Sequence, residues 1–184
     1  YAMQFDWFWD GLNLLRKDYD VHGQRLVTFM CDGVAYAMQH DWFWDALYWL
    51  RDAHGLHGKC MVSFMDGGAA SAMQYDYFVD GLEWFENEFQ LTEEHLASFM
   101  CNSVASVMDT DEFRSGMMWL KTRHGYVGAK LARFMCGGIA SRLGDKTFRA
   151  NFDALADIIG FDGARNVLRD NGKLASRFTS DNVT

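Results

Sequence analysis

A repeat of 35 residues constrains this chain more than any other feature of its sequence. The tetrapeptides YAMQ, YAMQ and SAMQ begin at Tyr1, Tyr36 and Ser71, and the register continues from Ser106 and Ser141 without an insertion or deletion. A fixed period of this length is typical of proteins whose similar units pack on one another. We therefore treat the chain as one array of five units and a partial sixth, with the boundaries 1–35, 36–70, 71–105, 106–140, 141–175 and 176–184.

The first half of each unit has the spacing of an amphipathic helix. In the first unit Phe8, Leu12 and Leu15 stand at i, i+4 and i+7, and large apolar residues occupy the same places in the other units. Side chains at these intervals lie on one face of a helix. We predict one helix of about 13 residues per unit, from Trp7 to Tyr19 in the first.

The residues that flank this apolar stripe predict how the helix begins and ends. A carboxylate ahead of the stripe can accept hydrogen bonds from the first helical amides, and a glycine behind it can adopt the left-handed C-terminal cap. The aspartates are Asp6, Asp41, Asp76 and Asp111, and the glycines are Gly55, Gly125 and Gly160. We expect these residues to cap the helices.

The second half of each unit is also apolar at helical spacing, as at Leu26, Phe29 and Met30 in the first unit. A small residue follows in the first four units: Gly33, Gly68, Ser103 and Gly138. Because glycine inside a helix costs about 1 kcal/mol relative to alanine, two interpretations stay open. This element is either one helix of about 16 residues or two pieces that are broken near the small residue.

Two helices per unit cannot bury their apolar faces alone, so the units must stack. We predict an all-α fold, a right-handed α-solenoid of five two-helix repeats of 35 residues plus a partial sixth. Polar Arg169 and Asp170 replace the Phe-Met pair of the earlier units, which is typical of a terminal capping unit. The first unit has no such polarity, so we expect further repeats, a cap or a partner upstream.

The composition excludes several classes of protein. The 184 residues carry a formal net charge of −8 and include four cysteines. No run of about 18 apolar residues is present, so the sequence predicts no membrane span. Four cysteines are too few for a disulfide scaffold at this length, and no signal peptide is recognisable, so we expect free thiols in a reducing compartment inside the cell.

The repeat explains most residues that might carry catalysis or bind a metal. Three of the four cysteines share one column of the repeat, which is typical of small buried side chains. His54, His57 and Cys60 form the densest metal-like cluster, but it does not recur in the other units and lacks a fourth ligand. We therefore predict a protein that is not an enzyme and has no metal and no cofactor.

Aromatic residues in the first units predict a surface for a protein partner. Trp9 and Trp44 point about 100° away from the apolar stripe of their helices. Phe5, His40 and Tyr75 lie just ahead of the same helix in successive units. Exposed aromatic patches mark contact sites, so we predict a partner surface here. The alternative is that neighbouring units or an upstream segment cover the two tryptophans.

Charge is distributed unevenly along the array. The third unit has seven acidic residues and no lysine or arginine, whereas the last two units each have a small net positive charge. Such a dipolar array suits head-to-tail contacts or two dissimilar partners.

The segment 89–103 and the His-Gly pairs at His54 and His124 resemble TALE-like repeats, which are helical hairpins of 33 to 35 residues whose inter-helix loop contacts one DNA base. The resemblance implies a base-contacting loop at Asp32, Gly67, Asn102, Gly137 and Gly172. The family follows this loop with Gly-Gly and a lysine or glutamine, whereas this chain has Val34 and Ala35 in the first unit.

Our leading hypothesis is a non-enzymatic helical-repeat module that binds a protein partner or forms part of a larger assembly. The alternative is a TALE-like solenoid that reads a nucleic-acid sequence, which the acidic net charge disfavours.

Overall fold

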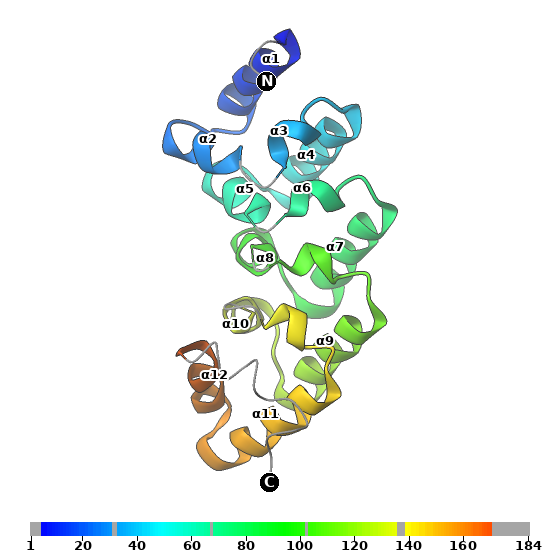
Figure 1. Cartoon of the computed structure of the whole chain (residues 1–184), viewed down its shortest axis with the longest axis vertical. Helices are drawn as coiled ribbons and strands as arrows, with labels where there is room; N and C mark the ends of the chain where they lie inside the picture. Colours follow the sequence, from blue (N-terminus) through cyan, green and yellow to red (C-terminus); the bar gives the residue numbers. More distant parts are fainter. Residues whose placement is uncertain (1–4, 31–32, 67, 102, 136–138, 171–184) are drawn as a thin grey trace.

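The computed structural model describes residues 5–30, 33–66, 68–101, 103–135 and 139–170, and all regular structure in them is helical (Figure 1). Five long helices are α1 (Asp6–Asp18), α4 (Asp41–His54), α7 (Asp76–Phe89), α9 (Asp111–His124) and α11 (Lys146–Ile159). Each is followed by a middle helix: α2 (Gln24–Phe29), α5 (Gly58–Met65), α8 (Glu93–Met100), α10 (Gly128–Phe134) and α12 (Phe161–Asp170). The first four units end with a short helix: α3 (Val34–Ala37), α6 (Ala69–Ala72), η2 (Val104–Ser106) and η3 (Ala140–Arg142). The prediction of an all-α fold is confirmed for the described residues.

The second half of a unit is two pieces, not one helix. The middle and short helices are separated at Gly33, Gly68 and Ser103, whose φ angles are 87°, 82° and 60°. Positive φ interrupts a right-handed helix, and glycine adopts it without steric cost. The two-piece interpretation is therefore correct at these three breaks, while Gly138 lies outside the described residues.

The aspartates predicted as N-caps are instead the first residues of their helices. Phe5, His40 and Tyr75 occupy the cap position and make no capping hydrogen bond through their side chains. A carboxylate in the first turn still interacts favourably with the positive end of the helix dipole, which accounts for the acidic column. The cap itself is polar in the last two units, where Thr110 accepts from the Phe113 amide at 3.3 Å and Asp145 from the Thr147 amide at 2.8 Å.

The C-terminal caps agree better with the sequence. Gly55 and Gly125 end α4 and α9 in the left-handed conformation, as predicted. Gly160 has a φ of 78° but a ψ of 158°, so it does not form a left-handed cap. Gln90 takes the left-handed position at the end of α7.

The predicted apolar columns form the core. Phe43, Phe78 and Phe113 of the long helices are buried, and so are Phe64 and Phe99 of the middle helices. Phe64 meets Phe78 edge to face with the ring centroids 6.1 Å apart, and Phe85 meets Phe99 at 4.8 Å. The core is therefore built where the middle helix of one unit meets the long helices beside it.

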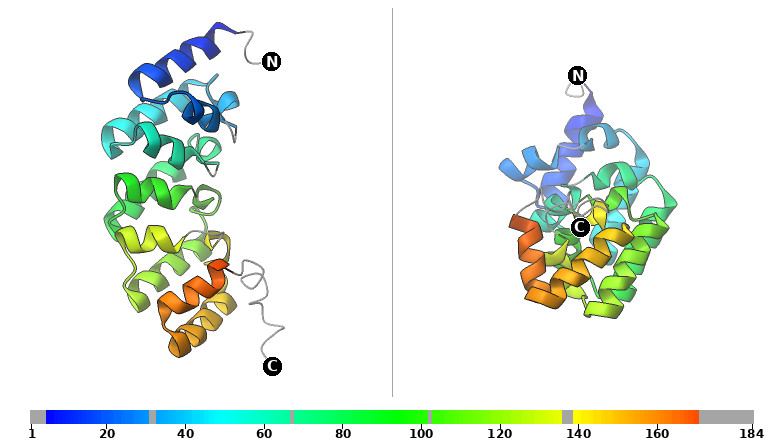
Figure 2. Two further views of the ribbon diagram at one scale, coloured as in Figure 1. Left: turned by 90° about the vertical axis from the view of Figure 1, so that its left-hand side faces the viewer. Right: turned by 60° about the horizontal axis from the view of Figure 1, so that its bottom comes forward.

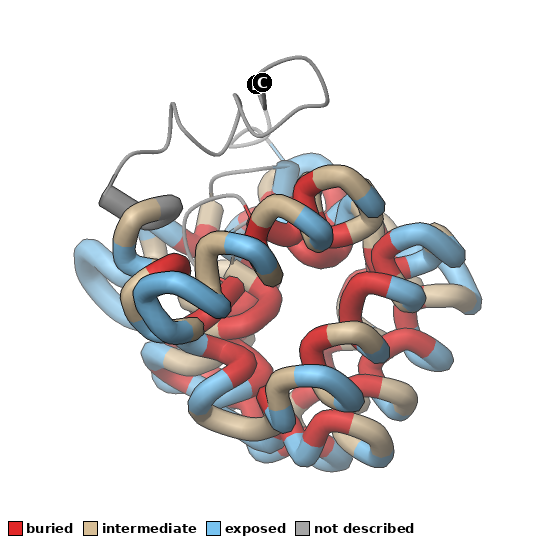
Figure 3. Tube along the Cα trace, turned by 90° about the horizontal axis from the view of Figure 1, so that it is seen from below, coloured by how far each residue is buried: buried red, intermediate tan, exposed pale blue. Residues whose placement is uncertain are grey.

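The units follow one another along the long axis of the molecule, from α1 at one end to α11 and α12 at the other (Figures 1 and 2). The middle helices α2, α5, α8 and α10 pack in series, as do the short helices α3, α6 and η2. In Figure 1 the middle helices line one side and the long helices the other. Seen along the axis, the helices form a ring with many exposed stretches at its outer edge (Figure 3).

One pair of repeat positions joins successive long helices in the same register. The nineteenth residue of one unit contacts the sixteenth residue of the next unit. These contacts are Arg51 over the Tyr19 ring at 5.3 Å, His54 Nδ1 with Glu86 Oε1 at 2.6 Å, and Lys121 over the Phe89 ring at 5.7 Å. The chemistry of the pair changes, but its place does not, so the first four units stack with one geometry.

Candidate binding surface

Three stacked aromatic pairs stand at the starts of α1, α4 and α7. In each pair the N-cap residue lies parallel to the residue two places later, and we call these six side chains the aromatic ladder. The pairs are Phe5 with Trp7 at 6.1 Å and 15°, His40 with Trp42 at 5.6 Å and 14°, and Tyr75 with Tyr77 at 5.3 Å and 12°. The sequence-based prediction includes the first member of each pair but not the second, although an aromatic–Asp–aromatic triplet recurs in three units.

The backbone explains why the pairs are copies of one another. The N-cap residues Phe5, His40 and Tyr75 have extended φ values of −115°, −115° and −112°, with ψ near 140°. This conformation turns the N-cap ring toward the first turn of the helix, where the second ring stands. Thr110 and Asp145 replace the aromatic N-cap in the last two units, and their side chains accept hydrogen bonds from amides of the first helical turn. The ladder is therefore confined to the first three units.

The ladder is partly exposed. Phe5 and Tyr75 keep 45% and 49% of their surface, while Trp7, Trp42 and Tyr77 are half-buried. His40 is half-buried as well, and the Tyr36 ring lies against it at 5.3 Å. The outer member of a pair thus offers a ring to a partner, while its inner neighbour holds that ring in place.

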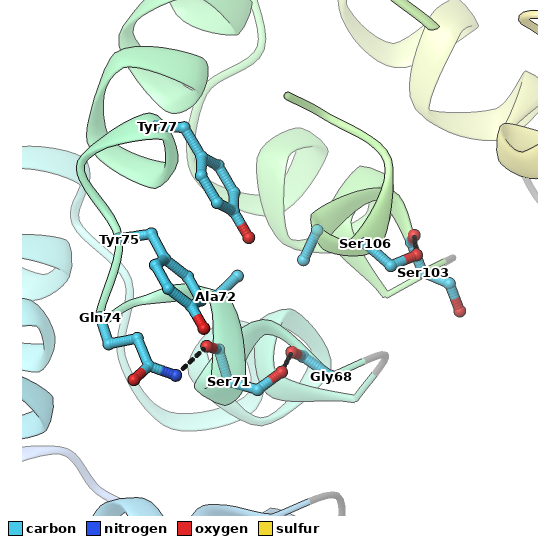
Figure 4. A pocket seen from close by; sticks show the side chains of 9 residues that line it. Gly68, Ser71, Ala72, Gln74, Tyr75, Tyr77, Ser103 and Ser106 are labelled. Carbon is cyan, nitrogen blue, oxygen red and sulfur yellow. Dashed lines mark hydrogen bonds between the residues drawn. The ribbon is translucent and has the colours of Figure 1, made fainter. Parts of the chain in front are cut away.

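A pocket of about 300 Å³ opens beside the third pair (Figure 4). Tyr75 and Tyr77 lie on one side of it, with their hydroxyl groups directed toward it. Ser103 near the end of the same unit and Ser106 at the start of the next lie on the other side. Ser71 stands where the second unit has Tyr36, and this smaller side chain leaves space beside the ring of Tyr75.

Polar groups in this pocket are mostly tied to the backbone. Ser71 Oγ donates to the Gly68 carbonyl at 2.8 Å, and Gln74 Nε2 donates to the Ser71 carbonyl at 2.9 Å. Burial raises the pKa of Tyr77, and the nearby carboxylate of Asp109 raises it further. The Tyr77 hydroxyl therefore stays protonated at neutral pH and remains able to donate a hydrogen bond.

Trp9 and Trp44 differ in their surroundings. Trp9 is 48% exposed, in line with the prediction. Trp44 is only partly exposed, so the expectation of an exposed ring is wrong for this residue. Its Nε1 donates to the Met38 carbonyl at 2.9 Å, and its ring lies against Gly11 of the preceding long helix. Trp44 belongs to a junction between units.

The predicted base-contacting residues Asp32, Gly67, Asn102, Gly137 and Gly172 lie outside the described residues.

The three residues of the metal-like cluster have separate roles. His54 is buried and contacts Glu86, and His57 Nδ1 lies 2.8 Å from the Gly55 carbonyl in an exposed loop. Cys60 is half-buried on α5, and burial raises the pKa of its thiol. In the part of the chain that the structure describes, no three His, Cys, Asp or Glu side chains are grouped to hold a metal ion.

A second pocket, of about 240 Å³, lies between α10 and α12 and was not anticipated from the sequence. Its basic lining comes from Lys130, Arg133 and Arg165. Tyr126 donates to Asp162 at 3.1 Å on its wall, and burial together with this bond raises the pKa of the phenol.

Comparison with protein-family models, with curated proteins and with solved structures gives no match for this chain. Among the helices described, none has the length and apolarity needed to cross a membrane.

Proposed function

We propose that this chain is a right-handed α-solenoid that works as a non-enzymatic binding module and holds a protein partner on the aromatic ladder. One observation carries the proposal: the same stacked pair recurs at the start of three successive long helices, with Phe5 and Tyr75 about half exposed. Covering such rings removes apolar surface from water, and aromatic side chains are enriched at protein interfaces.

The rigidity of the ladder supports this proposal. Each outer ring is stacked on a second ring of its own helix, and the long helices are held in register by the junction pairs, such as His54 with Glu86. A preorganised surface loses less conformational entropy when a partner binds. The ladder therefore suits recognition of a complementary chain without rearrangement of the units.

The charge of the units that carry the ladder favours a protein over a nucleic acid. The third unit has seven acidic residues and no basic one, which opposes phosphate groups. The nucleic-acid alternative has one supporting feature, the basic pocket of Lys130, Arg133 and Arg165 in the last units. We also propose that the module belongs to a larger assembly in a reducing compartment, which the free thiol of Cys60 supports.

A substitution that the array itself offers tests the ladder without disturbing the helices. In the serine variant, Phe5, His40 and Tyr75 are all changed to Ser. Serine is a preferred N-cap residue, and Thr110 already shows this chemistry in the fourth unit, so the helices should form as before. The matched control changes three exposed apolar residues elsewhere to Ser: Val27, Met118 and Ile158.

The experiment is capture from a cell lysate with the chain as bait, with and without nuclease. We expect the wild type and the control variant to retain the same protein after nuclease treatment and the serine variant to lose it. Capture that disappears with nuclease contradicts a protein partner and favours the nucleic-acid alternative. Capture that is unchanged in the serine variant contradicts the assignment to the ladder.

A further inference from the structure

We infer that the occupant of the aromatic ladder is an extended segment of the partner that is rich in arginine or lysine. This inference rests on the proposed function and goes further, because it gives the chemistry of the bound segment.

Every pair of the ladder is flanked by two carboxylates. One aspartate stands between the two aromatic residues, and a second stands four places later on the same face of the helix. The six residues are Asp6 and Asp10, Asp41 and Asp45, and Asp76 and Asp80, and all are exposed. The helix starts that carry the rings are therefore negatively charged in each of the first three units.

Apart from the interaction of Asp6, Asp41 and Asp76 with the helix dipole, these carboxylates have no charged partner within the described residues. Carboxylates at the junctions behave differently, since Glu86 contacts His54 and Glu88 contacts Lys121 at 2.7 Å. Like charges four places apart repel each other weakly, and a cation placed between them relieves this repulsion.

An aromatic ring beside a carboxylate is a favourable site for a guanidinium or ammonium group. The protein uses this contact within its own fold, where Arg51 lies 5.3 Å from the Tyr19 ring centroid and Arg114 lies 5.3 Å from that of Trp84. The exposed rings of Phe5 and Tyr75 have the same ring chemistry, and each is followed directly in the sequence by an exposed carboxylate that is in no ion pair. A cationic side chain thus complements both the ring and the carboxylate at each of these helix starts.

The spacing of the units selects an extended segment. The units repeat along the axis at the spacing of the middle helices α2, α5 and α8, which pack in series. Packed helices are usually about 8 to 10 Å apart, and an extended chain advances about 3.3 Å per residue. Every third residue of an extended segment therefore meets the next pair. We expect the bound segment to end before the fourth unit. Arg114 of the fourth unit and Arg149 of the fifth stand at the place that Trp9 has in the first unit, and they would repel a basic segment. Beside the last pair, the pocket of about 300 Å³ has room for a long side chain.

The test is a titration of the whole chain with short labelled peptides, followed by fluorescence anisotropy. The probe has arginine at every third position with serine and glycine between, and the reference peptide has glutamine in place of each arginine. We expect the arginine peptide to bind about tenfold more tightly or better. The change of Asp10, Asp45 and Asp80 to Asn should weaken that binding by about tenfold.

A control with the same loss of charge separates the ladder from the net charge. It changes Asp18 to Asn, Glu94 to Gln and Asp157 to Asn, which are exposed carboxylates outside the first two turns of α1, α4 and α7. Equal weakening by the control triple, or equal affinity for the glutamine peptide, overturns the inference. Neither result overturns the proposed function, which stands or falls on capture by the serine variant.

Discussion

The Nδ1 atom of His54 lies 2.6 Å from Oε1 of Glu86, and this contact joins α4 to the next long helix, α7. His54 is buried and Glu86 half-buried. At the next junction the same two places of the repeat hold Phe89 and Lys121, whose contact is a cation over an aromatic ring. Two kinds of contact thus maintain the same register between long helices. We therefore expect that the residues of one junction can replace those of the other.

The first prediction exchanges that chemistry. The change of Glu86 to Ala alone should lower the free energy of unfolding by about 1 to 3 kcal/mol, because a buried imidazole nitrogen loses its partner. The double change of His54 to Phe and Glu86 to Lys copies the ring and the cation of the Phe89–Lys121 junction, without the ion pair of Lys121 with Glu88. It should unfold in urea within about 1 kcal/mol of the wild type. The His54 Nε2 atom, which is buried without a hydrogen bond, is also removed by this exchange. A double variant as unstable as the Glu86 variant would contradict the equivalence of the junctions.

Two helical glycines should respond differently to alanine. A Cβ atom on Gly116 would fall against the backbone carbonyl of Leu143, which has no freedom to move away. A Cβ atom on Gly81 would meet only the terminal methyl of Met108, which can turn aside. Gly116→Ala should lower the free energy of unfolding by about 2 kcal/mol, whereas Gly81→Ala should change it by less than about 1 kcal/mol. Equal effects in urea denaturation would contradict the packing at these junctions.

The left-handed break at Ser103 predicts a stabilising substitution. Ser103 has a φ of 60°, where the first two units have glycine at the same place, and a left-handed L-residue costs about 1 to 2 kcal/mol. Ser103→Gly should raise the free energy of unfolding by about 0.5 to 1 kcal/mol. The bond from Ser106 Oγ to the Ser103 carbonyl is retained, since it uses only the backbone of residue 103. A lower thermal midpoint for this variant would contradict the left-handed conformation of residue 103.

Alkaline pH should destabilise the fold through its buried phenols. Burial raises the pKa of Tyr19, although Arg51 opposes the shift. The folded chain then keeps a proton that the unfolded chain releases, so this contribution is complete below about pH 10 and is lost as the pH rises above it. Tyr19→Phe should therefore reduce the loss of stability between pH 9 and pH 11, as followed by circular dichroism.

At neutral pH, Tyr19 and Tyr126 should respond differently to replacement by phenylalanine. The Tyr19 hydroxyl is buried without a hydrogen bond, so Tyr19→Phe should leave the free energy of unfolding unchanged or raise it by up to about 1 kcal/mol. Tyr126→Phe removes the bond to Asp162 and should lower that free energy by about 1 kcal/mol. The opposite order of the two variants would contradict the surroundings described for these hydroxyl groups.

Much of the fold followed from the repeat, because a column that is apolar in every unit must face the core. Phe43 and Phe99 are buried as that argument requires, and α1 begins and ends within one residue of its predicted bounds. The break at Gly68 stayed open, since propensity alone does not separate a bent helix from two pieces.

The candidate site was only partly predictable, because it depends on where one unit lies against the next. A helical wheel directs Trp44 outward, but the bond to the Met38 carbonyl holds its ring at a junction. The stacking of Tyr75 on Tyr77 follows from an extended N-cap residue, and the sequence had suggested Asp76 as the cap. The first error arises from the packing of one unit on the next and the second from backbone conformation at the helix start, and side-chain periodicity reports neither.

The most direct test of the central claim is the affinity of a captured partner protein for the wild type and for the serine variant, measured by calorimetry. The account predicts a dissociation constant raised about tenfold or more by the three serines, with an unchanged thermal midpoint and helix signal. An equal dissociation constant for the two proteins would contradict the assignment of partner binding to the aromatic ladder.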